Sequence, residues 1–284
     1  MDTDAASLFW FLVPGVVIPL ALTWRAFRSP TDRQLRRWAT TCGVELTPET
    51  ELMVRAHLGR VRRFRSVAAL PFWWLYVAPL VFGSDLVAVA SPAPALVAYL
   101  VGGLVAELTA RPVEPGAARS ASFVPRTVAD YRPAWLEVVP WVLLALAAGF
   151  SVVPRLTGSS VGNATAPAAV VVALALVVLA EVAARRVARR PQRSGSTDVL
   201  AADDALRATA VSLCAGVALL VGTSAVQVAA LAAATGSSGV VPLLLQLLLL
   251  PVQMLGFGAL WCIVRQETWG YRPRHRQVQQ VGAA

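Results

Sequence analysis

Long apolar stretches separated by arginine-rich segments form the dominant pattern along the chain. Seven stretches have the length and hydropathy of membrane-spanning helices: residues 8–24, 67–83, 91–110, 136–153, 167–184, 207–234 and 240–264. A hydrocarbon core of roughly 30 Å is crossed by about 20 helical residues, and somewhat shorter stretches cross it where the bilayer thins locally. The pattern therefore predicts an all-α fold, a polytopic bundle of seven transmembrane helices.

Signals for two further helices lie in the polar segment that follows the first apolar stretch. Thr31 and Gln34 have the spacing of a capping box, and Gly43 can end the helix that begins there by adopting the left-handed conformation. Residues 47–49, Thr-Pro-Glu, then supply a cap, a first-turn proline and an acid for a second helix over roughly residues 48–65. We predict two helices joined by a short turn.

This pair of helices has two interpretations. One is a helix-turn-helix that binds DNA, but its second helix would run through the arginines of residues 60–65 straight into a membrane span. The other is a basic amphipathic hairpin that lies on anionic lipid headgroups, which we favour, so we expect no nucleic-acid partner. The predicted organisation is an N-terminal span at 1–24, a cytoplasmic basic hairpin at 25–66, a six-span bundle at 67–264 and a basic cytoplasmic tail at 265–284.

Composition and charge add an orientation to this picture. The 284 residues are 57% hydrophobic and only 14% charged, with a mean hydropathy of +0.62, which excludes an ordinary soluble domain. All 25 basic residues are arginine, and the segments 25–66, 109–135, 185–207 and 265–284 hold 10, 4, 6 and 4 of them, leaving only Arg155. Under the positive-inside rule this distribution predicts that the N-terminus is outside and the C-terminus is in the cytoplasm.

An internal repeat relates two parts of the chain. The hexapeptide AELTAR at 106–111 returns as AEVAAR at 180–185, and the same offset of 74 residues aligns further positions without a gap. The predicted copies cover about 94–153 and 167–234; because they differ by two spans, they are parallel two-helix repeats rather than inverted ones. The aligned polar pairs are Glu107 with Glu181, Arg111 with Arg185, and Asp130 with Asp204.

The repeated glutamates are the first candidates for chemistry. A carboxylate inside a membrane is costly and is by default a candidate for a proton or substrate role. However, Glu107 and Glu181 lie near the cytoplasmic ends of their spans, and each has an arginine four residues on, Arg111 and Arg185, in the favourable order for a helical ion pair. We favour interfacial ion pairs, and the proton or substrate role stays open.

Two further sets of polar residues have the same ambiguity. Asp130 and Asp204 are predicted to lie in short helical segments just before the returning spans, either as a docking surface or as surface ion pairs with the loop arginines, which we favour. Gln246 and Gln253, seven residues apart on the last span, either line a polar pathway or bond across helices; Gly256 nearby favours close helix packing.

Several chemistries are excluded by what the sequence lacks. Its only histidines, His57 and His275, both fall in segments predicted to be cytoplasmic, so a histidine-based metal, haem or protease site cannot be built within the membrane. It contains no Walker A sequence. The cysteines at 42, 214 and 262 have no metal-like or redox spacing and are read as small core residues without a disulfide. We therefore predict no catalytic residue, metal or cofactor, and no enzymatic activity.

The paired motifs also carry a resemblance. AELTARP with SFVPRTVADYRP, and AEVAARR with STDVLAADDALRA, resemble multi-pass membrane proteins of high-GC actinobacteria to which no activity is assigned; the likeness covers roughly residues 25–222 and implies an inner-membrane location only. The function we predict is a non-enzymatic scaffold or accessory subunit. Its basic cytoplasmic face would contact anionic headgroups through residues 25–66, or a membrane or cytoplasmic protein partner. The alternative is a small-solute permease that uses the repeated carboxylates.

Overall fold

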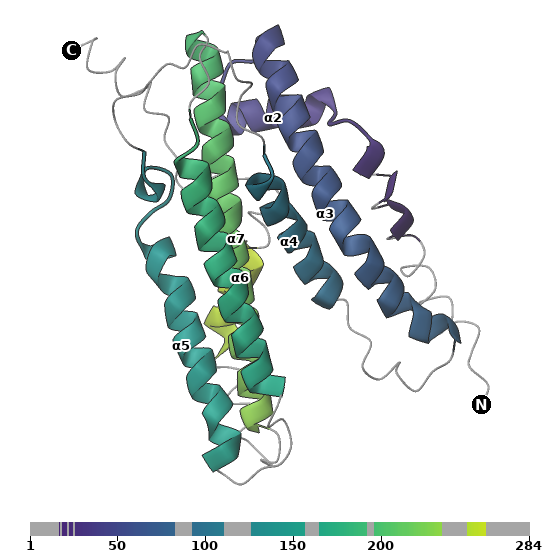
Figure 1. The fold of residues 1–284 in the computed structure, drawn as a ribbon, viewed down its shortest axis with the longest axis vertical. Helices are drawn as coiled ribbons and strands as arrows, with labels where there is room; N and C mark the ends of the chain where they lie inside the picture. Colours follow the sequence, from purple (N-terminus) through teal and green to yellow (C-terminus); the bar gives the residue numbers. More distant parts are fainter. Residues whose placement is uncertain are drawn as a thin grey trace. The chain divides into compact units, whose positions relative to one another are not determined.

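The described part of the chain is helical and contains no strand. The computed structural model describes residues 17, 19–21, 23–24, 26–82, 93–110, 126–156, 165–191, 196–234 and 249–259. Its helices are α2 (Asp32–Cys42), α3 (Pro48–Phe82), α4 (Ala93–Leu108), the 3-10 turn η2 (Val128–Asp130), α5 (Trp135–Leu156), α6 (Thr165–Ala188), α7 (Thr197–Ala234) and a short apolar helix at Leu249–Ala259 (Figure 1). The predicted all-α class is confirmed for these residues.

The chain divides into two compact units. Unit 1 comprises residues 1–37 and 46–111, and in it α3 packs along α4. Unit 2 comprises residues 38–45 and 112–284, and in it α5 and α6 both pack against α7 (Figure 1). The sequence repeat is not matched by this division, because α4 and α5 belong to different units whereas α6 and α7 share one.

The local signals before α3 act as predicted. The backbone N–H of Thr31 donates to Oε1 of Gln34 over 3.1 Å at the start of α2, and Gly43 follows that helix with a φ of 67°. At the start of α3, the backbone N–H of Thr47 donates to Oγ1 of Thr50 over 2.8 Å, and the N–H of Thr50 donates back to Oγ1 of Thr47 over 3.3 Å. These caps end α2 and start α3 where the sequence places them.

The second helix of this segment runs straight into the apolar stretch that follows it, as predicted. Helix α3 continues without interruption for 35 residues, from the basic segment through to Phe82. Residues 60–70 contain neither glycine nor proline, so nothing local stops the helix there. Pro71 lies further along and does not end the helix either. Membrane helices tolerate proline where neighbouring groups satisfy the carbonyl that the proline leaves without a backbone hydrogen bond.

Within the described residues, three helices are long and apolar enough to cross a membrane: Trp135–Val153, Thr165–Ala188 and Thr197–Ala234. They correspond to the predicted fourth, fifth and sixth spans. The sixth begins ten residues earlier than predicted, since α7 runs unbroken from Thr197. Helix α4 has 16 residues, about 24 Å at 1.5 Å per residue, and ends at Leu108 rather than at 110. The predicted spans at 8–24 and 240–264 lie largely outside the described residues.

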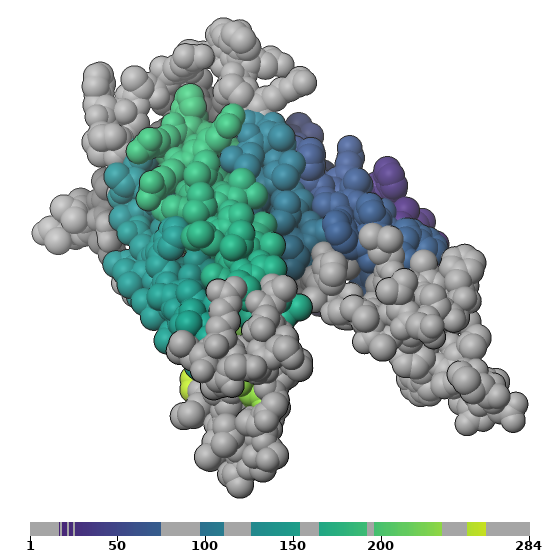
Figure 2. Space-filling view, turned by 60° about the horizontal axis from the view of Figure 1, so that its bottom comes forward, coloured from purple at the N-terminus to yellow at the C-terminus, as the bar shows by residue number. Residues whose placement is uncertain are grey.

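In unit 2 large apolar side chains cover much of the outer surface of α5 and α6, and small residues lie at close helix contacts. Alanine is the commonest buried residue of α7, beside buried valine and leucine, and a methyl group added at Gly222 would lie 3.1 Å from Cβ of Leu143 on α5. On α5 and α6 the exposed side chains include Trp141, Leu146 and Val171. Figure 2 shows these two helices as a broad teal and green surface. Small residues at helix contacts and large apolar residues outside are compatible with membrane insertion.

Candidate functional site

Charged side chains gather at one end of unit 2, where η2 and the start of α5 meet the end of α6 and the start of α7. We call this group the ionic cluster; it consists of Arg126, Tyr131, Arg132, Glu181, Arg185, Asp203, Asp204 and Arg207. It includes three of the sequence candidates, Glu181, Arg185 and Asp204. Arg126 lies just before η2, and Tyr131 lies in the turn between η2 and α5, where Pro133 prevents the chain from continuing as a helix.

Asp204 lies at the buried side of the cluster. Its Oδ1 accepts hydrogen bonds from the Arg126 guanidinium and, over 2.9 Å, from the Tyr131 hydroxyl. Only 5% of the residue is exposed, so the prediction of a surface ion pair is wrong for Asp204. Burial, and then the negative charge of Asp204, raise the pKa of Tyr131 to about 12, so the phenol is held as a hydrogen-bond donor.

Glu181 joins α6 to the segment before α5. One oxygen accepts from Arg132 over 2.7 Å and the other from Nε of Arg185 over 3.1 Å. The second contact is the pair four residues apart that the sequence predicts. The contact with Arg132 was not predicted, because Arg132 lies 49 residues away in sequence. The Arg132 side chain is only 4% exposed. Nε of Arg132 also lies 3.6 Å from Glu137. Glu181 thus neutralises two arginines from different elements.

Arg207 closes the turn between α6 and α7. It bonds Asp203 over 2.7 Å, and its remaining N–H groups donate to the carbonyl oxygens of Arg190 and Pro191 over 2.5 and 2.8 Å. These carbonyls follow the end of α6, where a helix leaves acceptors without intrahelical partners. The Arg207 side chain is 5% exposed, so this bond set is buried. Arg207 therefore caps one helix while belonging to the next.

Asp130 has a local role that differs from that of its repeat partner. Its Oδ2 accepts the backbone N–H of Thr127 over 2.8 Å and caps η2. Asp204, at the aligned position, lies inside the continuous helix α7 instead. The difference follows from Pro133, which aligns with Arg207: only the first copy carries a proline that stops a helix from passing through the aspartate.

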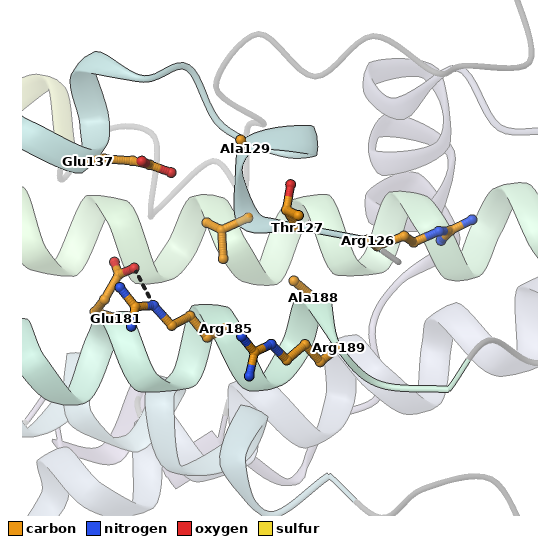
Figure 3. A pocket seen from close by; sticks show the side chains of 9 residues that line it. Arg126, Thr127, Ala129, Glu137, Glu181, Arg185, Ala188 and Arg189 are labelled. Carbon is orange, nitrogen blue, oxygen red and sulfur yellow. Dashed lines mark hydrogen bonds and ion pairs between the residues drawn. The ribbon is translucent and has the colours of Figure 1, made fainter. Parts of the chain in front are cut away.

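A cavity of about 250 Å³ opens beside the ionic cluster, between η2 and α6 (Figure 3). Figure 3 shows Glu181 bonded to Arg185 on α6, with Arg189 one turn on and Thr127 across the cavity. Both signs of charge line it, because Glu137 and Glu181 accompany the arginines. Among the described residues no three histidine, cysteine or acidic side chains are placed to hold a metal ion. The arrangement binds charges to one another and offers no nucleophile paired with a base.

Glu107 lies in unit 1, where it contacts His57, and its predicted pair with Arg111 stays a prediction. Its side chain is 1% exposed on α4, and Oε1 lies 3.3 Å from Nε2 of His57 on α3. The expectation that Glu107 reaches the surface is therefore wrong, because α3 covers it; Arg111 lies outside the described residues. The antiparallel pairing of the helices accounts for the contact. The same register places the buried Arg65 guanidinium 5.6 Å from the Tyr99 ring.

A contact that the sequence did not predict ties the end of α2 to α7 in unit 2. Trp38 Nε1 donates to Oγ1 of Thr209 over 3.2 Å, and the Cys42 thiol lies beside the same hydroxyl. Cys42 and Cys214 are buried free thiols, as predicted. Burial raises the pKa of Cys42 to about 11. The signal for this contact is the buried stripe of α2, whose spacing of three and four residues predicts an apolar face but not its partner.

Of the two amide candidates, only Gln253 lies within the described residues. Gln253 is half-buried on the helix Leu249–Ala259, and Gln246 lies outside the described residues. That helix packs on α7 at Gly256, where a methyl group would lie 2.8 Å from Oγ1 of Thr223. The close approach predicted at Gly256 is confirmed, and it makes this part of the helix a packing surface.

Comparison with protein-family models, curated proteins and solved structures finds no match to this chain.

Proposed function

We propose that this chain is a multi-pass integral membrane protein of the inner (plasma) membrane that acts as a non-enzymatic scaffold or accessory subunit. The proposal includes seven spans, an outside N-terminus and a cytoplasmic C-terminus, because the arginine-rich segments then share one side. The outward apolar side chains of α5 and α6 support insertion. The likeness to actinobacterial membrane proteins belongs to the same proposal.

The observation that carries the scaffold role is that every carboxylate of the ionic cluster is bonded to an arginine of the same cluster. Its three carboxylates, Glu181, Asp203 and Asp204, each accept a bond from at least one arginine of the cluster. Two of these bonds join positions 49 and 78 residues apart in sequence. A transport site needs groups that bind and release their ion in turn, whereas groups held by several fixed bonds fasten elements together. We infer that the cluster holds α5, α6 and α7 in one arrangement.

The proposed partner surface is the basic segment 25–66. It holds ten arginines and four acids, an excess of six positive charges. Two of its acids, Asp32 and Glu51, pair with Arg55 and fix α2 to α3 within unit 1. The exposed arginines of this segment would contact anionic headgroups or an acidic face of a membrane or cytoplasmic protein.

A small-solute permease is the second candidate, favoured by the pair of Glu107 and His57. A carboxylate that is buried within a predicted span, beside an imidazole, is by default a candidate for a proton or substrate role.

The experiment that separates the two functions replaces Glu107 and Glu181 singly with glutamine. Complementation of a strain that lacks the gene is measured against the amount of folded protein in the membrane fraction, with Asp198→Asn as a control for loss of one carboxylate. A scaffold predicts that activity in the cell falls only in proportion to folded protein, and mostly for Glu181→Gln. Full folded protein with no complementation in Glu107→Gln would instead support the permease.

A further inference from the structure

An apolar groove runs between α3 and α4 in unit 1, and one end of it is positively charged. It encloses about 360 Å³ and is lined by Arg63, Phe64, Val67 and Ala68 of α3 and by Val101 and Val105 of α4. The two helices are antiparallel neighbours in unit 1 (Figure 1). Arg63 and Val105 therefore lie toward one end of the groove, and Ala68 and Val101 toward the other.

Gly102 makes the groove narrow and deep at its base. A methyl group at this position would lie 2.5 Å from the carbonyl oxygen of Phe64 and 2.8 Å from Cβ of Ala68. The backbones of α3 and α4 thus approach more closely than any larger residue allows. Val67 stays half exposed beside this contact, and Val101 and Val105 are partly exposed, so the groove is open along its side. This shape admits a flexible hydrocarbon chain.

Among the residues that the structure describes, no carboxylate is paired with the arginine at the charged end of the groove. From residue 52 to residue 82, α3 contains no carboxylate and has five arginines before Ser66, at 55, 60, 62, 63 and 65. Arg55 is already paired with Asp32 and Glu51, and the single acid of α4, Glu107, faces His57. Arg63 is exposed and forms no ion pair with the carboxylates that the structure describes. The groove therefore combines an apolar lining with the exposed guanidinium of Arg63 at one end.

We propose that this groove is a binding site for one anionic phospholipid, with an acyl chain between α3 and α4 and the headgroup phosphate at Arg63. The inference rests on the proposed membrane location and adds a specific ligand class to it. An acyl chain gains little by leaving other lipid tails, which are as apolar as the groove. Selectivity must then come from the charge of the headgroup, and shape fixes where that lipid sits.

The test uses the full chain, purified in a non-ionic detergent and freed of lipid, with native mass spectrometry to count bound lipids. Phosphatidylglycerol and phosphatidylcholine with identical acyl chains are compared. We expect phosphatidylglycerol to bind at least about fivefold more tightly, and Arg63→Gln to remove about fivefold of that preference, which corresponds to about 1 kcal/mol per arginine at an anionic surface. The matched control is Arg186→Gln, an exposed arginine of α6 that removes the same charge and should change the preference less than about twofold.

A second pair of variants tests the groove itself. Val67→Trp should fill it and weaken the first binding event of both lipids by a similar factor, because the acyl chain is common to them. Val171→Trp, at a similarly exposed valine of α6, should leave both unchanged. Equal effects of Arg63→Gln and Arg186→Gln, or of the two tryptophan variants, would overturn the site. Resistance of each variant to carbonate extraction reports separately on membrane insertion, so the site can fail while the proposed location holds.

Discussion

Replacing Asp204 with asparagine tests whether the ionic cluster stabilises the fold. The change keeps the size and one acceptor oxygen but removes the charge that faces Arg126 and Tyr131. Loss of one partner from a fully buried pair costs about 3–5 kcal/mol; because Arg126 is 20% exposed and asparagine still accepts a bond, we expect about 2–3 kcal/mol. At about 2–4 °C per kcal/mol for a chain of this size, the midpoint of thermal unfolding should fall by about 4–12 °C.

The assay is thermal unfolding in detergent, followed by the fluorescence of the nine tryptophans. Asp198→Asn is the control, because Asp198 lies in the first turn of the same helix and outside the ionic cluster, and it should change stability by less than about 0.5 kcal/mol. Tyr131 gives an independent readout: its pKa should fall below about 12 in Asp204→Asn, measured as the phenolate absorbance that Tyr131→Phe removes. Equal midpoints for the two asparagine variants would refute the reasoning.

Two further predictions concern a thiol and two glycines. In a Cys262→Ser background, Cys42 should resist alkylation at pH 8, because a thiol with a pKa of about 11 is then roughly one part in a thousand thiolate. The contribution of the buried thiol to stability should be lost as the pH rises from 9 to 11. Rapid labelling of the folded protein at pH 8 would contradict this. Gly102→Ala should destabilise the protein by about 1–3 kcal/mol, since its methyl group would meet the carbonyl oxygen of Phe64. Gly149→Ala, where the methyl group would have no atom within 4 Å, should be neutral or stabilising by up to about 1 kcal/mol. Thermal midpoints that move together in the two variants would show that helix propensity alone decides both.

The elements that could be predicted from the sequence are those whose cause is local. Thr31, Gly43 and Thr47 mark helix ends through bonds to residues within a few positions, and each acts as expected. The pair of Glu181 with Arg185 belongs to the same class. Helix α3 runs through the change from polar to apolar sequence near residue 65 as expected, because that change marks a change of environment and a helix passes through such a boundary without breaking.

The contacts that were missed join positions far apart in the chain. Tyr131 bonds Asp204 across 73 residues, and Trp38 bonds Thr209 across 171. Periodicity identifies which face of a helix is buried but not which helix covers it, so the burial of Asp204 and the partner of Glu107 could not be derived from spacing. Pro133 was a readable signal: its absence from the second copy predicts that Asp204 continues into a helix.

The measurement that tests the account most directly is the sidedness of the arginine-rich segments. Reporter fusions after residues 45, 120, 195 and 275 should report the cytoplasm, and fusions after residues 87, 160 and 237 should report the outer side. The fusion after residue 195 carries the most weight, because it follows the turn that Arg207 closes beside the ionic cluster. A cytoplasmic signal there together with an outer signal at 160 is the result we predict. An outer signal at 195 would place six arginines outside, and would contradict both the topology and the basic cytoplasmic face on which the proposed function rests.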